Sequence, residues 1–156
     1  MERTLVMLKP DAVQRGFIGR ILGRFEDKGL KIVAMKLAKV SPALAERHYA
    51  PHKGKDFYEP LIRFVTSGPM VFLVLEGKGA VAVVRKMMGA TFGPNAEPGT
   101  IRGDFGMSNR FNLVHGSDSP EAAAHEITLF FRPDELIDWQ PAAWPWTYDF
   151  STGAPV

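Results

Sequence analysis

Four short apolar stretches, separated by segments with helical periodicity, limit the folds that this chain can adopt. Each stretch has the length of a strand, whereas the apolar residues between them recur every three or four positions, which is typical of amphipathic helices. Such a chain has to cover a sheet with helices, which predicts an α+β sandwich. The apolar stretches lie at residues 5–8, 31–40, 70–75 and 111–115.

The helical segments have recognisable boundaries. Ser41-Pro42 and Ser119-Pro120 each combine an N-cap serine with a proline at the first helical position, and Gly29 ends the first helix. The order of elements matches the ferredoxin-like βαββαβ sandwich, with an antiparallel four-stranded sheet and an extra helix after the second strand. The predicted helices lie at residues 17–25, from 42, at 57–65, at 80–88 and from 120.

Residues 89–110 show no periodicity. They contain five glycines and two prolines, yet also Ile101, Arg102 and Phe105. A stretch of this length without regular structure in a compact domain is usually functional or disordered. Because it carries apolar and cationic side chains, we expect an ordered functional loop.

The bulk composition indicates one domain over residues 1–156 and excludes several classes of protein. A net charge of +2 gives no strong field for a polyanion, so nucleic acid is not expected to be the primary partner. The absence of cysteine excludes disulfides and thiolate nucleophiles and favours a cytoplasmic location. No segment approaches the roughly 20 apolar residues of a membrane helix, so no membrane partner is expected.

His115 stands between the last apolar stretch and a turn of small polar residues. In the helix that follows, Glu126 shares a face with Ala122, Ala123 and Phe130, where an unpaired carboxylate would be costly. An antiparallel return of the chain would bring Glu126 to His115. The carboxylate would then fix one ring nitrogen and leave the other as a nucleophile. The alternative is a satisfied histidine–glutamate pair in the core.

Three cations stand at element ends or in the long loop: Lys9, Arg85 and Arg102. Together they would suit a polyphosphate, although each alone is better explained as a solvated surface charge. Phe57, beside a polar loop, would either stack on a base or anchor its helix. No Walker-type phosphate loop is present, and Pro51 interrupts any helix that joins His48 to His52, so a zinc site is not expected.

Five segments, in order, resemble the nucleoside diphosphate kinase family, and the resemblance spans Thr4 to about Trp139. We expect this span to form the core, with residues 140–156 as a C-terminal tail. The last segment contains the family's N-x-x-H-[GA]-S-D pattern around its phosphorylated histidine. The segments are TLVMLKPDAVQRGFIGRIL, HYAPHKGKDFY, SGPMVFLVLEG, VRKMMGATFGP followed by PGTIRGDFG, and NLVHGSDSPEAAAHEI.

The resemblance implies that His115 takes the γ-phosphoryl group from a nucleoside triphosphate, mainly ATP, and passes it to a nucleoside diphosphate in a ping-pong cycle. Glu126 matches the carboxylate that orients the imidazole, and Tyr49 a tyrosine that supports the phosphohistidine pocket. Lys9 is assigned to both catalysis and nucleotide binding, and Phe57 to stacking on the base. The implied nucleotide-binding residues are Lys9, Phe57, Arg85, Thr91, Arg102 and Asn112.

The resemblance also implies Mg²⁺ that bridges the β- and γ-phosphates and is held mainly by the nucleotide. It further implies a homo-oligomer, a hexamer in preference to a tetramer. One departure is Pro51, at the tip of the nucleotide clamp, where family members commonly carry a carboxylate. The alternative function is that of a family-like regulatory protein that binds nucleic acid or partner proteins.

Overall fold

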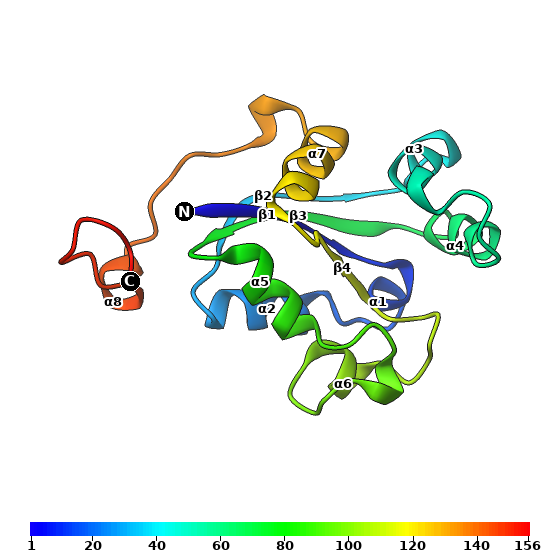
Figure 1. Cartoon of the computed structure of the whole chain (residues 1–156), viewed down its shortest axis with the longest axis horizontal. Coiled ribbons are helices and arrows are strands. Elements are labelled where there is room, and N and C mark those ends of the chain that lie inside the picture. The colour runs from blue at the N-terminus through cyan, green and yellow to red at the C-terminus, as the bar shows by residue number, and fades with distance from the viewer.

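The computed structural model describes residues 1–156 and contains one antiparallel sheet of four strands in the order β2-β3-β1-β4 (Figure 1). This is the strand order that a βαββαβ chain gives when each helix crosses back over the sheet, and it confirms the predicted fold class. The strands are β1 Glu2–Leu8, β2 Lys31–Ala38, β3 Met70–Gly77 and β4 Val114–Gly116.

Each predicted helix is present. Ser41 and Ser119 act as the predicted N-caps, since their side chains accept hydrogen bonds from the backbone N–H groups of Leu44 and Ala122. The helices are α1 Pro10–Gln14, α2 Ile18–Asp27, α3 Pro42–His48, α4 Tyr58–Val65, α5 Ala80–Met88, α6 Ile101–Phe105, α7 Pro120–Phe130 and α8 Trp144–Thr147, with 3₁₀ turns at Ala50–His52, Gly93–Asn95 and Pro133–Glu135.

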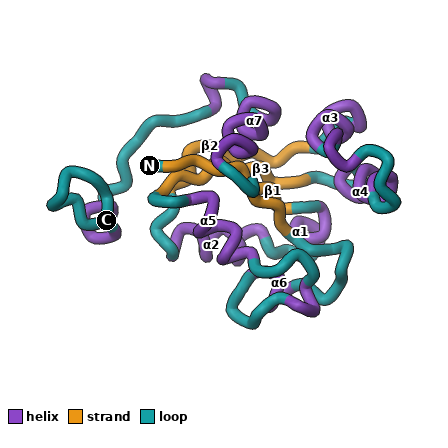
Figure 2. The backbone as a smooth tube through the Cα atoms, viewed as in Figure 1, coloured by secondary structure: helices purple, strands orange, loops and turns teal.

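Helices cover both faces of the sheet. In Figures 1 and 2, α7, α3 and α4 lie over one face, and α2 and α5 lie under the other. The alternation of side chains along β1 divides the core accordingly. Leu5 and Met7 pack with Phe72 and Ile127 on the α7 face, whereas Val6 packs with the residues of α2 and α5 on the opposite face. Because both faces are covered, all eight residues of β3 are buried.

The segment before His115 differs from the prediction. A strand was predicted over residues 111–115, but β4 begins at Val114, because Leu113 has a positive φ of 70° that breaks the extended conformation. The predicted loop at 89–110 is ordered but contains α6, which Thr100 caps through a hydrogen bond from the N–H of Gly103. Gly103 lowers the helical propensity of this segment, so the sequence did not predict a helix here. A glycine is nevertheless required, because the carbonyl oxygen of Glu97 leaves no room for a Cβ.

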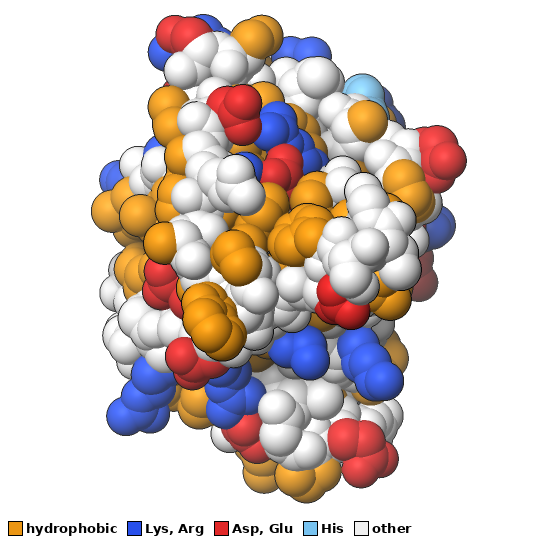
Figure 3. Space-filling view, turned by 90° about the vertical axis from the view of Figure 1, so that its left-hand side faces the viewer, with side chains coloured by type: hydrophobic (Ala, Val, Ile, Leu, Met, Phe, Trp, Pro, Cys, Tyr) orange, Lys and Arg blue, Asp and Glu red, His pale blue; other side chains and the backbone are white.

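The C-terminal tail extends from the sheet, and α8 lies at the end of the molecule opposite α3 and α4 (Figure 1). Residues 137–139, directly before the tail, are hydrogen-bonded to β2. The N–H of Ile137 donates to the carbonyl of Val33, and the indole N–H of Trp139 donates to the carbonyl of Ile32. Figure 3 views this end of the molecule and shows hydrophobic side chains gathered in the middle of the face. None of the helices has the length and apolar character to cross a bilayer.

Candidate active site

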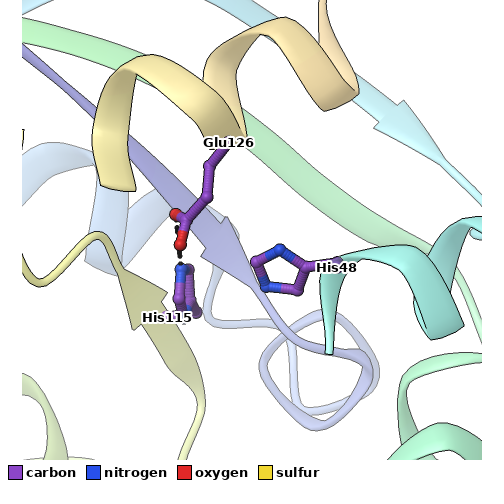
Figure 4. A group of neighbouring side chains, drawn as sticks. All are labelled: His48, His115 and Glu126. Carbon is purple, nitrogen blue, oxygen red and sulfur yellow. Dashed lines mark hydrogen bonds and ion pairs between the residues drawn. The ribbon is translucent and has the colours of Figure 1, made fainter. Parts of the chain in front are cut away.

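His115 lies in β4, opposite Met7 of β1, and its side chain projects from the sheet face that α7 covers (Figure 4). Its neighbours Val114 and Gly116 therefore face the other side, where Val114 packs into the core under α5. The imidazole retains 22% of its exposure, so it is not a fully buried core side chain. Its position in the edge strand leaves one side of the ring open to a ligand.

Glu126 and Ser117 form a hydrogen-bonded chain with His115. Oε2 of Glu126 lies 2.9 Å from Nε2 of His115 and accepts a hydrogen bond from the buried hydroxyl of Ser117 at 2.7 Å. Burial alone would raise the pKa of Glu126, but the hydrogen bonds and charge of His115, with Ser117 and His48, hold it below its ordinary value. The carboxylate is therefore ionised and accepts, so Nε2 of His115 donates and the lone pair of Nδ1 is free.

The backbone before His115 is held in an uncommon conformation by Asp11. Oδ2 of Asp11 accepts the N–H of Leu113 at 3.0 Å, and the carbonyl of Leu113 accepts the N–H of Lys9 at 2.8 Å. A positive φ is strained for a leucine, so both bonds are needed to maintain it. Burial raises the pKa of Asp11 in spite of these contacts and of the charge of Lys9.

The side chains of Lys9 and Asn112 are hydrogen-bonded to each other. Nζ of Lys9 donates to Oδ1 of Asn112 at 2.8 Å, and Nδ2 of Asn112 donates to the carbonyl of Thr91 at 3.0 Å. Burial, together with the nearby charge of Arg102, lowers the pKa of Lys9 to about 8, against a smaller opposing effect of Asp11. Lys9 therefore remains a cation at neutral pH but loses its proton far more readily than an exposed lysine.

Arg102 joins the loop to β4. Its Nε, Nη1 and Nη2 donate to the carbonyls of Asn112, Gly89 and Val114 at 3.1, 3.1 and 2.7 Å. A guanidinium has about five N–H donors, so about two remain for a phosphate. Burial and then the charge of Arg85 lower the pKa of Arg102 to about 10, which leaves it a cation. The guanidinium of Arg85 is close as well, since it donates to the carbonyl of Gly116 at 3.2 Å.

Tyr49 and Phe57 are the two aromatic residues among the predicted site residues. Tyr49 is 7% exposed, and its hydroxyl has no hydrogen-bond partner. Burial, followed by the charge of Glu126, raises the pKa of this hydroxyl, so it stays protonated. Phe57 is 49% exposed and lies on the surface, 5.3 Å from the ring of His52, so it is not a core anchor. Pro51 lies in the 3₁₀ turn between α3 and α4, where it ends the helix as predicted.

The family model described as nucleoside diphosphate kinase matches residues 2–136 of this chain. The chain belongs to the nucleoside diphosphate kinase family. Nucleoside diphosphate kinases from Synechococcus elongatus and Archaeoglobus fulgidus are 55% and 54% identical to it over 149 residues, which cover 96% of this chain and 100% and 99% of those proteins. It is accordingly a nucleotide-binding phosphotransferase with nucleoside diphosphate kinase activity.

Solved structures of the nucleoside diphosphate kinase family agree with the fold. The halophilic enzyme from Halobacterium salinarum, in complex with CDP, has a TM-score of 0.93 and 51% identity, covering 95% of this chain and 99% of that one. The enzyme from Encephalitozoon cuniculi has a TM-score of 0.91 and 39% identity, and the match covers 95% of this chain and 100% of that one.

Sequence reasoning missed three contributors to this nucleoside diphosphate kinase site. Ser117 belongs to the histidine motif, but nothing in its spacing indicates that it bonds Glu126. Asp11 acts on a backbone N–H that lies 102 residues away. His48 lies in α3 with its ring centroid 5.1 Å from that of His115, at nearly a right angle. A contact over such a sequence distance has no periodic signal.

Gly116, directly after His115, allows close packing of a helix against β4. A Cβ at Gly116 would lie 2.6 Å from the sulfur of Met88 and 3.1 Å from Val84, both in α5. Because side chains alternate along β4, the glycine allows α5 to approach the sheet on the face opposite the imidazole.

Proposed function

We propose that the chain transfers the γ-phosphoryl group of a nucleoside triphosphate, mainly ATP, to nucleoside diphosphates through a phosphohistidine at Nδ1 of His115. The observation that carries this proposal is the 2.9 Å contact between Nε2 and Glu126, which leaves Nδ1 as the free nitrogen of a partly exposed ring. A histidine whose other nitrogen is held by a carboxylate is an activated nucleophile.

In the first half-reaction the lone pair of Nδ1 forms a bond to the γ-phosphorus while the bond from that phosphorus to the β–γ bridging oxygen breaks. The electron pair of the broken bond leaves with the nucleoside diphosphate. In the second half-reaction a β-phosphate oxygen of another nucleoside diphosphate attacks the phosphohistidine, and the N–P bond breaks. Glu126 stabilises the positive charge that the imidazole acquires in between. A single nucleotide site is therefore sufficient.

The remaining site residues would bind the nucleotide. Lys9, Arg85 and Arg102 surround the approach to His115 with positive charge, which phosphoryl transfer requires. Mg²⁺ would arrive with the nucleotide phosphates as part of the substrate, since the carboxylates of Glu126 and Asp11 are already hydrogen-bonded. The exposed ring of Phe57 would stack on the base, which predicts broad tolerance of bases, because each base has a π-face. The complex of the Halobacterium relative with CDP supports the binding of a nucleotide by this chain.

The test is incubation of the purified protein with ATP and Mg²⁺, followed by intact-mass measurement. We expect one added phosphoryl group per chain, which is labile in acid because a phosphoramidate is protonated and hydrolysed there. The group should disappear when a nucleoside diphosphate is added. An unmodified mass under these conditions would contradict the mechanism.

Replacing Glu126 with glutamine should slow formation of the phosphoenzyme by about 100-fold, because a neutral amide does not stabilise the imidazolium or fix its tautomer. Rapid-quench measurement of phosphoenzyme formation gives the rate, and circular dichroism gives the folded fraction. Ser117→Ala, which removes only the hydrogen bond to Glu126, should show a smaller effect in the same direction. Loss of the fold in Glu126→Gln would show instead that the carboxylate is chiefly structural.

The pKa of Lys9, lowered to about 8, predicts a pH limit for the reaction. Below that pH the ammonium is charged, and above it the charge that faces the phosphates is lost, so kcat/KM should fall as the pH rises through about 8. The pH profile of kcat/KM reports groups of the free enzyme. In Lys9→Arg the charge persists to much higher pH, so the alkaline limb should vanish even if the maximal rate falls. A limb that is unchanged in Lys9→Arg would assign it to another group.

We further propose that residues 1–156 form a single cytoplasmic domain that assembles into a homo-oligomer, a hexamer in preference to a tetramer. Met35 and Leu37, on edge strand β2, are 57% and 62% exposed, and Trp146 in the tail is 94% exposed. Exposed apolar side chains on an unpaired strand edge favour pairing with another chain. Analytical ultracentrifugation would give the number of chains in the assembly.

A further inference from the structure

We propose that His48, His115 and Glu126 form a binding site for one transition-metal dication of the Zn²⁺ or Co²⁺ class, and that this ion inhibits phosphoryl transfer. One ring nitrogen of each histidine and one oxygen of Glu126 all lie within 4.8 Å of one another. The three side chains come from α3, β4 and α7; His115 is directed at Glu126, and the ring of His48 lies beside this pair (Figure 4).

The geometry is close to what such an ion requires. Zn²⁺ binds imidazole nitrogen and carboxylate oxygen at about 2.0–2.2 Å, so two ligands on a tetrahedral ion lie roughly 3.3 Å apart. Nε2 of His115 and Oε2 of Glu126 are already 2.9 Å apart. A small rotation of the His48 side chain would bring its nitrogen to the same ion. Two histidines and one carboxylate leave a fourth position for water or an anion.

The hydrogen bond between His115 and Glu126 marks the place of the ion. Nε2 of His115 and Oε2 of Glu126 share one proton across 2.9 Å. When the ion binds Nε2, that proton moves to Nδ1 of the same ring, and the ion takes its place between the two ligands.

The surroundings provide further support and define the metal class. Tyr49 is 7% exposed, and its buried hydroxyl has no hydrogen-bond partner. Burial, followed by the nearby charge of Glu126, raises the pKa of this hydroxyl. It is available to hydrogen-bond a ligand carboxylate or a metal-bound water, as outer-shell groups do. Imidazole ligands favour Zn²⁺, Co²⁺ and Cu²⁺ over Mg²⁺, so the Mg²⁺ of the substrate would not occupy this site.

Inhibition follows from where the ion would bind. A dication on Nε2 withdraws electrons from the imidazole and replaces the hydrogen bond by which Glu126 orients the ring. Nδ1 then carries the ring proton and has no free lone pair with which to attack phosphorus. This second part of the proposal rests on the proposed role of His115, whereas metal binding does not.

Metal binding is tested in the absence of nucleotide, because ATP itself binds these ions. Co²⁺ is added to the protein, and its visible absorption is recorded. We expect the intense bands of a four-coordinate Co²⁺ site that saturate at one ion per chain and are displaced by Zn²⁺. In His48→Gln the affinity should fall by about 100-fold, since losing a ligand costs at least as much as losing an outer-shell partner. His125→Gln removes an exposed histidine beside Glu126 in α7 and should bind as the wild type does.

Inhibition is tested by the rate of phosphoenzyme formation with Mg·ATP in excess and added Zn²⁺. Zn²⁺ should inhibit the wild type and His125→Gln, and a chelator should restore their rates. His48→Gln should need at least about tenfold more Zn²⁺ for the same fractional inhibition, measured against its own uninhibited rate. Equal Co²⁺ binding by His48→Gln and the wild type would overturn the site, and Co²⁺ binding without inhibition would overturn the inhibitory role. A wild type that forms no phosphoenzyme without Zn²⁺ would contradict the proposed function, while the Co²⁺ spectrum would still decide the metal site.

Discussion

The His115→Ala protein should form no phosphoenzyme with Mg·ATP, and its kcat for transfer between nucleotides should fall by at least roughly 10⁴-fold, as for other enzymes that lose their nucleophile. The physical reason is that no other group near the nucleotide site combines a free lone pair with a stabilising carboxylate. Intact-mass measurement and a coupled assay of nucleoside triphosphate formation give the two readouts.

The matched control for this substitution is His125→Ala. His125 is exposed in α7, directly before Glu126, and it is not hydrogen-bonded to the imidazole of His115. It should retain the phosphoenzyme and a rate close to that of the wild type. Because His115 is only part of the edge strand and is not in the core, both variants should unfold at nearly the same temperature. Formation of a phosphoenzyme by His115→Ala would show that another residue is the nucleophile.

Replacing Arg102 with methionine should have the second-largest effect, because this side chain has a structural role and is also proposed to bind the nucleotide phosphates. Its three hydrogen bonds to backbone carbonyls tie residue 89 and α6 to the strand that carries His115. Hydrogen bonds to a charged group contribute roughly 1.5–3 kcal/mol each, partly offset in a relaxed variant, so we expect a loss of about 3 kcal/mol. The midpoint of thermal unfolding should fall by roughly 10 °C, and the KM for nucleotides should rise.

Arg102→Lys separates the two roles. Lysine keeps the charge but is a point donor on a flexible chain, so it cannot serve three carbonyls in the geometry of a guanidinium. We expect most of the stability loss to persist, with a smaller rise in KM than in Arg102→Met. An unchanged unfolding temperature in both variants, measured by calorimetry, would show that the loop is held by other contacts.

Much of the fold could be predicted from periodicity, because strands and helices of this chain each bury one side or both. The pair of His115 with Glu126 was also within reach, since a carboxylate on a small apolar face needs a partner. The helix α6 was not, because Gly103, which weakens helical propensity, is required by a close contact with Glu97. Tertiary packing there overrides local preference.

The finer parts of the site depend on contacts between distant segments. The left-handed conformation of Leu113 has no signal in a leucine, since it is imposed by Asp11 from 102 residues away. Likewise, the sequence predicted Arg102 as a cation for phosphate, but its three hydrogen bonds to backbone carbonyls could not be predicted, because they depend on where the loop meets β4. Such roles follow from the path of the backbone and not from residue type.

The shortness of β4 has an evolutionary consequence. Successive residues of a strand face opposite sides, so one residue added or removed between Leu113 and His115 would turn the imidazole toward α5 and away from Glu126. The three-residue strand offers no length in which a shifted register could recover. We therefore expect insertions and deletions to be excluded from residues 112–117 even at positions where substitutions are accepted.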